Sequence, residues 1–210
     1  VLGLLLAAPT AFAKEKDPDA AHMHVQFRGG STTLADAHVR SVFGKSGKVF
    51  HLEYGWTSRI LELGAGAGFY QELGFLQTED GESSVEHDML TIWPLTASAT
   101  LRLDFFEEQV IVPFGRIGAD YWLWRENWYV YEGSTAEDHR KGGKAGWHWG
   151  AGGMILLDPI DRATASRLEA TVGIADTFLV VEYRSTMMPK GENQLLFSAS
   201  EVTFGLKFDF

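Results

Sequence analysis

Alternation of apolar with polar or small residues recurs along this chain, and it restricts the possible folds more than any other feature. In the last segment, "EVTFGLKFDF", every second residue from Val202 to Phe210 is apolar, and the residues between them are polar, charged or glycine. A period of two is typical of a β-strand whose two faces meet different surroundings. Eight segments show this pattern, at 22–28, 49–56, 60–72, 89–104, 113–124, 146–158, 177–185 and 201–210. We therefore predict an all-β domain with eight antiparallel strands.

The segments between the predicted strands alternate between long and short. Long links are expected at 29–47, 75–86 and 127–144, and short links at 57–59 and 105–109. Outer-membrane barrels of bacteria show this asymmetry, with short turns on the periplasmic side and longer loops outside. The connections therefore favour an up-and-down transmembrane β-barrel.

One connection, residues 158–176, has the pattern of a helix. Pro159 suits a first helical turn, the apolar residues are spaced roughly as on one helix face, and Gly173 can end the helix. We predict one short helix over about 159–171. Counting the crossings from a periplasmic N-terminus places this helix at the periplasmic rim of the barrel.

The first residues of the chain predict export. The run "VLGLLLAAPTAFA" is apolar and ends in a small-x-small sequence, after which "KEKDPD" is abruptly polar. This is the pattern of a secretory signal peptide with its cleavage site, and the run is shorter than the ~20 residues that a membrane helix needs. We therefore assign residues 1–13 to a signal peptide that is truncated at its N-terminus, and residues 14–210 to a single outer-membrane barrel domain.

Composition narrows the function classes. The net charge is −10 with a pI of about 5.1, which argues against a nucleic-acid binder because no basic stripe exists to neutralise phosphates. Cysteine is absent, so a disulfide framework, a thiolate zinc site and a cysteine nucleophile are all excluded for this sequence.

Alternation alone does not decide which face of the barrel is apolar. A soluble periplasmic carrier of the lipocalin kind also has eight strands, with the apolar face turned inward around a ligand. The membrane alternative is favoured because each apolar face has roughly the 9–11 residues that a tilted strand needs to cross a bilayer. Aromatic residues near the strand ends are expected to form girdles at the membrane interfaces. These are Tyr54, Trp56, Phe69, Tyr121, Trp147, Trp149, Phe208 and Phe210.

The opposite face carries charges of both signs, which points to a charged lumen. Eight strands enclose a lumen just wide enough for side chains, so we expect no large pore. Buried charges are tolerated only when they are paired, and we therefore predict an ion-pair network in the lumen. Its members are Glu53, Glu62, Arg102, Arg116, Asp120, Glu182, Arg184, Lys207 and Asp209. Gly64, Gly66 and Gly68 share this face and are expected to leave room for Trp122, Trp124 or Tyr70.

Three segments carry a resemblance to a known family. The tail "VTFGLKFDF" resembles the C-terminal strand signature of Gram-negative outer-membrane proteins, which the barrel assembly machinery recognises at a terminal aromatic such as Phe210. Together with "VFHLEYGW" and "DPIDRATASRLEATVGIADTFLVVEYRS", it is similar to the small outer-membrane β-barrel family of myxobacteria and related delta-proteobacteria. The resemblance covers most of residues 14–210 loosely and 158–184 best, and it departs at "GW", where the family often has an acidic residue. It implies the fold and an outer-membrane location, and it carries no catalytic residues.

The histidines do not establish a chemical site. His22 and His24 alternate on one face and His51 could join them, but two histidines at this spacing are weak evidence for a metal site. His148 is expected to point into the lumen between the outward Trp147 and Trp149. We therefore assign no metal, cofactor or catalytic residue.

The sequence as a whole predicts a structural or interaction role in the cell outer membrane. The expected partners are outer-membrane lipid and lipopolysaccharide, the barrel assembly machinery, and a protein partner at the external loops (29–47 and 127–144) or at the periplasmic helix. Two alternatives stay open, a small outer-membrane enzyme or narrow channel, and the soluble lipocalin-like carrier.

Overall fold

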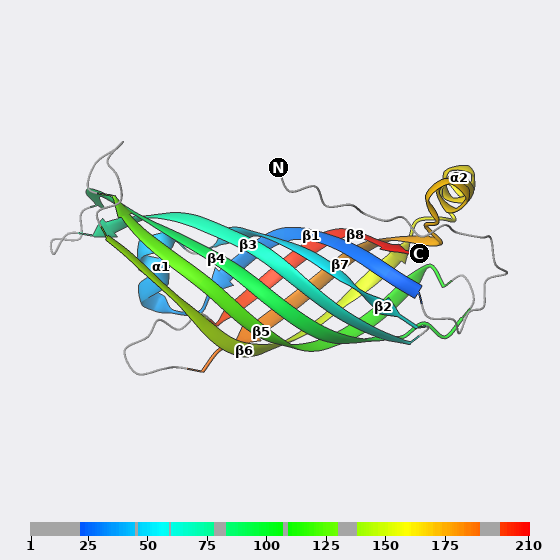
Figure 1. The fold of residues 1–210 in the computed structure, drawn as a ribbon, viewed down its shortest axis with the longest axis horizontal. Coiled ribbons are helices and arrows are strands. Elements are labelled where there is room, and N and C mark those ends of the chain that lie inside the picture. The colour runs from blue at the N-terminus through cyan, green and yellow to red at the C-terminus, as the bar shows by residue number, and fades with distance from the viewer. Residues whose placement is uncertain are drawn as a thin grey trace.

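The computed structural model describes residues 22–44, 46–58, 60–77, 83–106, 109–129, 138–189 and 198–210, and these residues form a closed β-barrel with two short helices (Figure 1). The predicted signal peptide, residues 1–13, lies outside the described residues. The strands are β1 (His22–Leu34), β2 (Gly47–Thr57), β3 (Leu61–Gln77), β4 (Ser83–Arg102), β5 (Ile111–Tyr129), β6 (Asp138–Leu156), β7 (Asp176–Met187) and β8 (Ala199–Asp209).

Each strand pairs antiparallel with its neighbour in the chain, and β8 pairs with β1 to close the barrel. The closing register places Phe27 opposite Leu206, and the N–H of Phe210 donates to the carbonyl of Met23 at 2.8 Å. The last residue of the chain therefore takes part in the closure, and each of the eight described strands pairs with two neighbours over the part that lies within the apolar belt, as a lipid environment requires. The predicted eight-stranded up-and-down barrel is confirmed.

The two ends of the barrel differ. At one end, here the turn end, β1 begins, β8 ends, and the strands are joined through residues 58–60, 103–110 and 157–175. The opposite end, where β1 ends and β8 begins, is here the loop end. Helix α2 (Arg162–Val172) lies at the turn end beside the C-terminus (Figure 1).

The sequence around α2 explains where this helix begins and ends. The Asp161 carboxylate accepts hydrogen bonds from the backbone N–H of Thr164 at 3.0 Å and from its hydroxyl at 2.7 Å, and these bonds lower the pKa of Asp161. Gly173 ends the helix at φ 76°, and its N–H donates to the carbonyl of Glu169. The predicted helix is confirmed, but Pro159 lies in the turn before it rather than in its first turn.

The strands continue into the segments that were predicted as long links, so the observed links are shorter than predicted. Residues 29–34 continue β1, residues 75–77 and 83–86 belong to β3 and β4, and residues 127–129 and 138–144 belong to β5 and β6. Because β4 has 20 residues and a tilted strand needs only about 9–11 to cross a bilayer, the strands continue well beyond the apolar belt. Beyond the apolar belt most of the outward side chains are polar, so alternation of apolar and polar residues does not identify the strand.

A second helix, α1 (Ala37–Phe43), occupies part of the predicted link 29–47. Asp36 accepts from the N–H of Val39, and Gly44 at φ 86° ends the helix with its N–H bonded to the carbonyl of Arg40. Neither of the two described helices is long and apolar enough to cross a membrane.

The polarity of the wall decides between the membrane barrel and the soluble carrier. Large apolar side chains point outward, as at Phe204 and Ile117, which are 65% and 64% exposed. Charged side chains point inward, as at Arg184 and Lys207, which are 2% and 0% exposed. A lipocalin-like barrel requires the reverse arrangement, so the soluble alternative is wrong.

Candidate functional site

The lumen contains a set of buried charges, and the structure places all nine residues of the predicted network there. Each of the nine has at least one oppositely charged partner or hydrogen-bond partner within the barrel. They form three clusters that follow one another from the turn end towards the loop end.

The central cluster joins opposite walls of the barrel. Glu53 of β2 accepts from Arg28 at 3.2 Å and from Arg116 of β5 at 2.8 Å. Glu182 of β7 is ion-paired with the same two residues, with Arg116 at 3.5 Å and with Arg28 more closely. Two guanidinium groups and two carboxylates thus neutralise one another, and each carboxylate bridges both cations.

The cluster near the turn end is also doubly bridged. Glu62 of β3 pairs with Lys207 of β8 and with Arg102 of β4, the latter at 3.2 Å. Asp209 pairs with the same two cations, with Arg102 at 3.2 Å and with Lys207 at 2.9 Å. Arg102 also reaches Asp104, beyond the end of β4, at 3.3 Å. This cluster joins β3 and β4 to the closing strand.

The third cluster lies nearer the loop end. Asp120 of β5 is ion-paired with Arg184 of β7, and its second oxygen lies 2.7 Å from Nδ1 of His148. On another part of the wall, Nε2 of His51 lies 3.1 Å from Glu201. The predicted inward position of His148 is confirmed.

Sequence reasoning missed two members of the network. Arg28 and Glu201 are as deeply buried as the nine predicted residues. Arg28 is ion-paired with Glu53 and Glu182, and Glu201 lies 3.1 Å from Nε2 of His51. The signal for both was present, because Arg28 shares its face with Gln26, and Glu201 shares its face with Lys207. Parity along the strand would have been enough to include them.

His24 and His51, which could have belonged to one metal site, interact with different side chains. Nδ1 of His24 lies 2.7 Å from the hydroxyl of Thr57, whereas His51 is paired with Glu201. Within the described ranges, no group of three or more histidine, aspartate or glutamate side chains is arranged to hold a metal ion.

The inward glycines make room for network side chains rather than for tryptophan. A Cβ at Gly64 would lie 2.8 Å from a carboxylate oxygen of Glu53, and a Cβ at Gly68 would lie 2.7 Å from Nδ1 of His51. Trp122 instead lies in an apolar layer nearer the loop end. The expectation that these glycines leave room for Trp122, Trp124 or Tyr70 was therefore wrong, because the neighbours across the ladder are fixed by register, which composition does not reveal.

Apolar layers flank the charges. Towards the turn end, buried side chains of β5, β6 and β7 pack together, and the Phe178 ring lies under Arg102 and Lys207 at 5.1 and 5.5 Å. Towards the loop end, Val39 and Phe43 of α1 join a layer that includes Leu90 and Ile92 of β4. In Figure 1, α1 lies within the outline of the barrel at the loop end. Helix α1 therefore helps to fill the barrel mouth.

Gly74 of β3 lies directly against α1. A Cβ built there would lie 2.7 Å from the Phe43 ring and 2.8 Å from the carbonyl of Val42. We expect Gly74→Ala to displace α1 and to increase tryptic cleavage after the exposed Arg40 several-fold. Gly115→Ala is the control, since a Cβ at Gly115 meets no atom within 4 Å. Equal cleavage of both variants would contradict this packing of α1.

The predicted girdle residues lie on the outer side of the wall, where six of the eight are exposed and Phe208 and Phe210 are half-buried. Tyr54, Trp56, Phe208 and Phe210 lie near the turn end. Phe69, Tyr121 and Trp147 lie eight to ten positions from the turn-end limit of their strands. This separation is close to the length of strand that crosses a bilayer.

Solved structures with the same fold include two small barrels. Neisserial surface protein A superposes with a TM-score of 0.55 at 14% identity, over 91% of this chain and 99% of that one. The outer membrane protein OprG from Pseudomonas aeruginosa superposes with a TM-score of 0.54 at 9% identity, over 91% of this chain and 97% of that one. No protein-family model matches the chain, and no curated protein matches it significantly. At these identities the likeness concerns the fold, and the chain has the fold of a small eight-stranded outer-membrane β-barrel.

Proposed function

We propose that this chain is an integral outer-membrane protein with a structural or interaction role. The observation that carries the proposal is the inverted polarity of the barrel, with ion-paired charges inside and large apolar side chains outside. Such a wall is stable only where lipid covers it, because hydrocarbon replaces water around the apolar face.

The orientation follows from the general rule for such barrels, in which short turns face the periplasm. The turn end with α2 is then periplasmic, and the loop end faces the cell exterior. We propose that a protein partner binds at residues 127–144, of which 130–137 lie outside the described residues and Lys141 is exposed, or at α2, none of whose residues is buried. The part of 29–47 that forms α1 is less suited to this role, because Val39 and Phe43 are buried in the mouth.

The biogenesis of the protein is part of the same proposal. Residues 1–13 would direct export, residues 14–210 would form the single barrel domain, and Phe210 would be recognised by the barrel assembly machinery. The resemblance of residues 158–184 supports membership of the myxobacterial and delta-proteobacterial barrel family. The eight outer aromatic residues would anchor the barrel at the two membrane interfaces.

Fractionation tests the proposal. We expect the protein to stay in membranes after carbonate washing and to migrate faster on gels when unheated than when boiled, because the closed barrel resists detergent. Release by carbonate together with a single mobility would overturn it. For the narrow-channel alternative, planar bilayers are the test, and we expect no steady conductance, because apolar layers flank the charges on both sides.

A further inference from the structure

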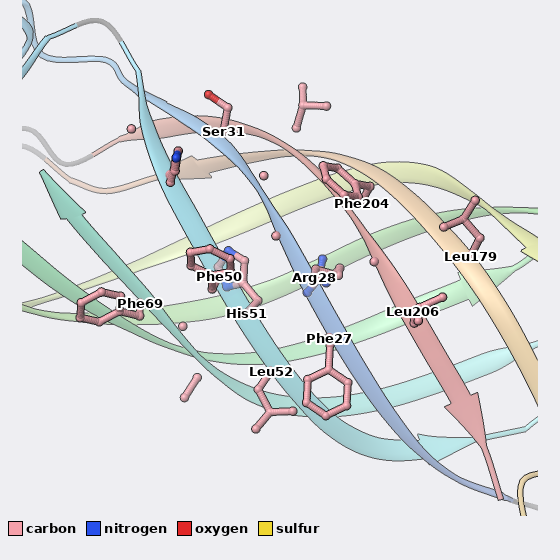
Figure 2. A pocket seen from close by; sticks show the side chains of 18 of the residues that line it. Phe27, Arg28, Ser31, Phe50, His51, Leu52, Phe69, Leu179, Phe204 and Leu206 are labelled. Atoms are coloured by element: carbon pink, nitrogen blue, oxygen red, sulfur yellow. The ribbon is translucent and has the colours of Figure 1, made fainter.

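The outer wall carries a groove across the seam where β8 meets β1 (Figure 2). It has a volume of about 1270 Å³, and most of the residues that line it take outward positions on β1, β2, β3, β7 and β8. In Figure 2, Phe50 and Leu52 stand on one side of β1, and Phe204 and Leu206 stand on the other. The groove therefore follows the closing strand pair on the face that the proposed function gives to lipid.

The depth of the groove comes from small residues on β1. Gly29 and Ser31 take the two outward positions that follow Phe27 towards the loop end. A Cβ at Gly29 would lie 3.2 Å from the Phe50 ring, so this ring leans over a position without a side chain. The neighbouring walls, by contrast, carry the strongly exposed Phe50 and Phe204.

The groove changes from apolar to polar at its loop end. Ser31 of β1 is paired in register with Lys48 of β2, and both line the groove together with Ser46. Lys48 is exposed and takes the next outward position beyond Phe50. Glu72 lies near enough to interact electrostatically with Lys48. One end of the groove thus presents a cation and hydroxyl groups, and the remainder presents hydrocarbon.

We propose that this groove binds one multi-chain lipid of the outer leaflet, with its acyl chains along Phe27, Phe50 and Phe204 and its anionic phosphate at Lys48. The inference rests on the proposed function. The stretch of β8 from Val202 to Phe208 spans roughly 20 Å at ~3.3 Å per residue, which suits a fatty acyl chain. The volume exceeds the ~300–1,000 Å³ of ordinary small-molecule sites, so the groove has room for more than one chain.

A second copy of the chain fits the groove less well. A two-fold dimer contact must be complementary to itself, because the same patch meets its copy. Here a concave floor at Gly29 would face another concave floor, while the Phe50 and Phe204 rings of the two copies would meet each other. Flexible acyl chains fill such a shape without this conflict.

Photo-crosslinking in vesicles tests the inference with the full chain. Phosphatidylcholine vesicles would contain a small fraction of phosphatidylglycerol that carries a diazirine on one acyl chain. We expect mass spectrometry to find labelling concentrated on Phe27, Phe50 and Phe204 rather than on the wall around Gly153. Gly29→Leu should reduce the labelling of these residues several-fold, whereas Gly153→Leu, at an outward glycine with no atom within 4 Å of its Cβ position, should not.

The contact between Lys48 and the lipid head group is tested by comparing an anionic with a zwitterionic probe. Lys48→Gln should lower labelling by the phosphatidylglycerol probe about fivefold, as expected for one surface lysine near an anionic lipid. It should leave labelling by the matching phosphatidylcholine probe unchanged, and Lys141→Gln on the opposite wall should change neither.

Three results would overturn the inference. They are labelling spread evenly around the barrel, labelling that survives Gly29→Leu, and crosslinks at the groove that join two protein chains. Heat-modifiable mobility is recorded on every sample. A chain that lacks it has not inserted, which would overturn the proposed function as well, whereas an inserted chain without localised labelling would overturn the lipid site alone.

Discussion

Replacing Leu95 with arginine is expected to lower the free energy of unfolding of the barrel in vesicles by about 2–4 kcal/mol. Leu95 points outward from the middle of the apolar stretch of β4, between Trp93 and Ala97. An arginine there must leave its charge in hydrocarbon or bend towards the interface, and both cost free energy. Denaturant titration of the refolded protein, followed by tryptophan fluorescence, measures the change.

The matched control is Ser200→Arg on β8, also an outward position. Ser200 lies near the loop end of its strand, where the outward residues become polar, and the hydroxyl of Tyr183 donates to it at 3.4 Å. Arginine near the membrane interface costs only about 0–1 kcal/mol. If the two variants lost the same stability, Leu95 would not lie at the bilayer centre, and the assignment of the outer wall to lipid would fail.

Much of this fold could be predicted from parity, that is, from whether a residue has an odd or even position along its strand. Because successive side chains of a strand point to opposite faces, one charged residue that faces the lumen assigns the whole strand, as Glu62 does for β3 and Lys207 for β8. The same alternation predicted the nine buried charges. Applied to every charged residue of the strands, it would also have predicted that Arg28 and Glu201 face the lumen.

The remainder depends on information that parity does not contain. Which carboxylate meets which cation is set by the offset between strands and by contacts across the lumen, so the pairing of Arg28 with Glu182, 154 residues apart, cannot be read from a strand pattern. Helix α1 was missed because its burial depends on the barrel mouth around it. The strand limits at the loop end were missed because the outward face there is polar, and the alternation fades.

Glu182→Gln is expected to cost about 3–5 kcal/mol of unfolding free energy, the usual cost of leaving a buried charge without its partner. Glu182 is fully buried and ion-paired with Arg28 and Arg116. The amide keeps the shape of the side chain but removes the negative charge, so two guanidinium groups are left to share Glu53. Glu169→Gln on the exposed face of α2 is the control and should change the stability by less than ~0.5 kcal/mol.

A second substitution distinguishes charge compensation from simple packing. Adding Arg28→Met to Glu182→Gln removes the one excess cation and leaves Arg116 with Glu53, which are 2.8 Å apart. The double variant should therefore lose less stability than the sum of the two single variants, with a coupling of about 0.5–3 kcal/mol. Strictly additive losses would mean that Glu182 does not stabilise the lumen by compensating the charge of Arg28. A favourable coupling would show that the lumen is stable because its charges cancel within each cluster, as a barrel without a wide aqueous lumen requires.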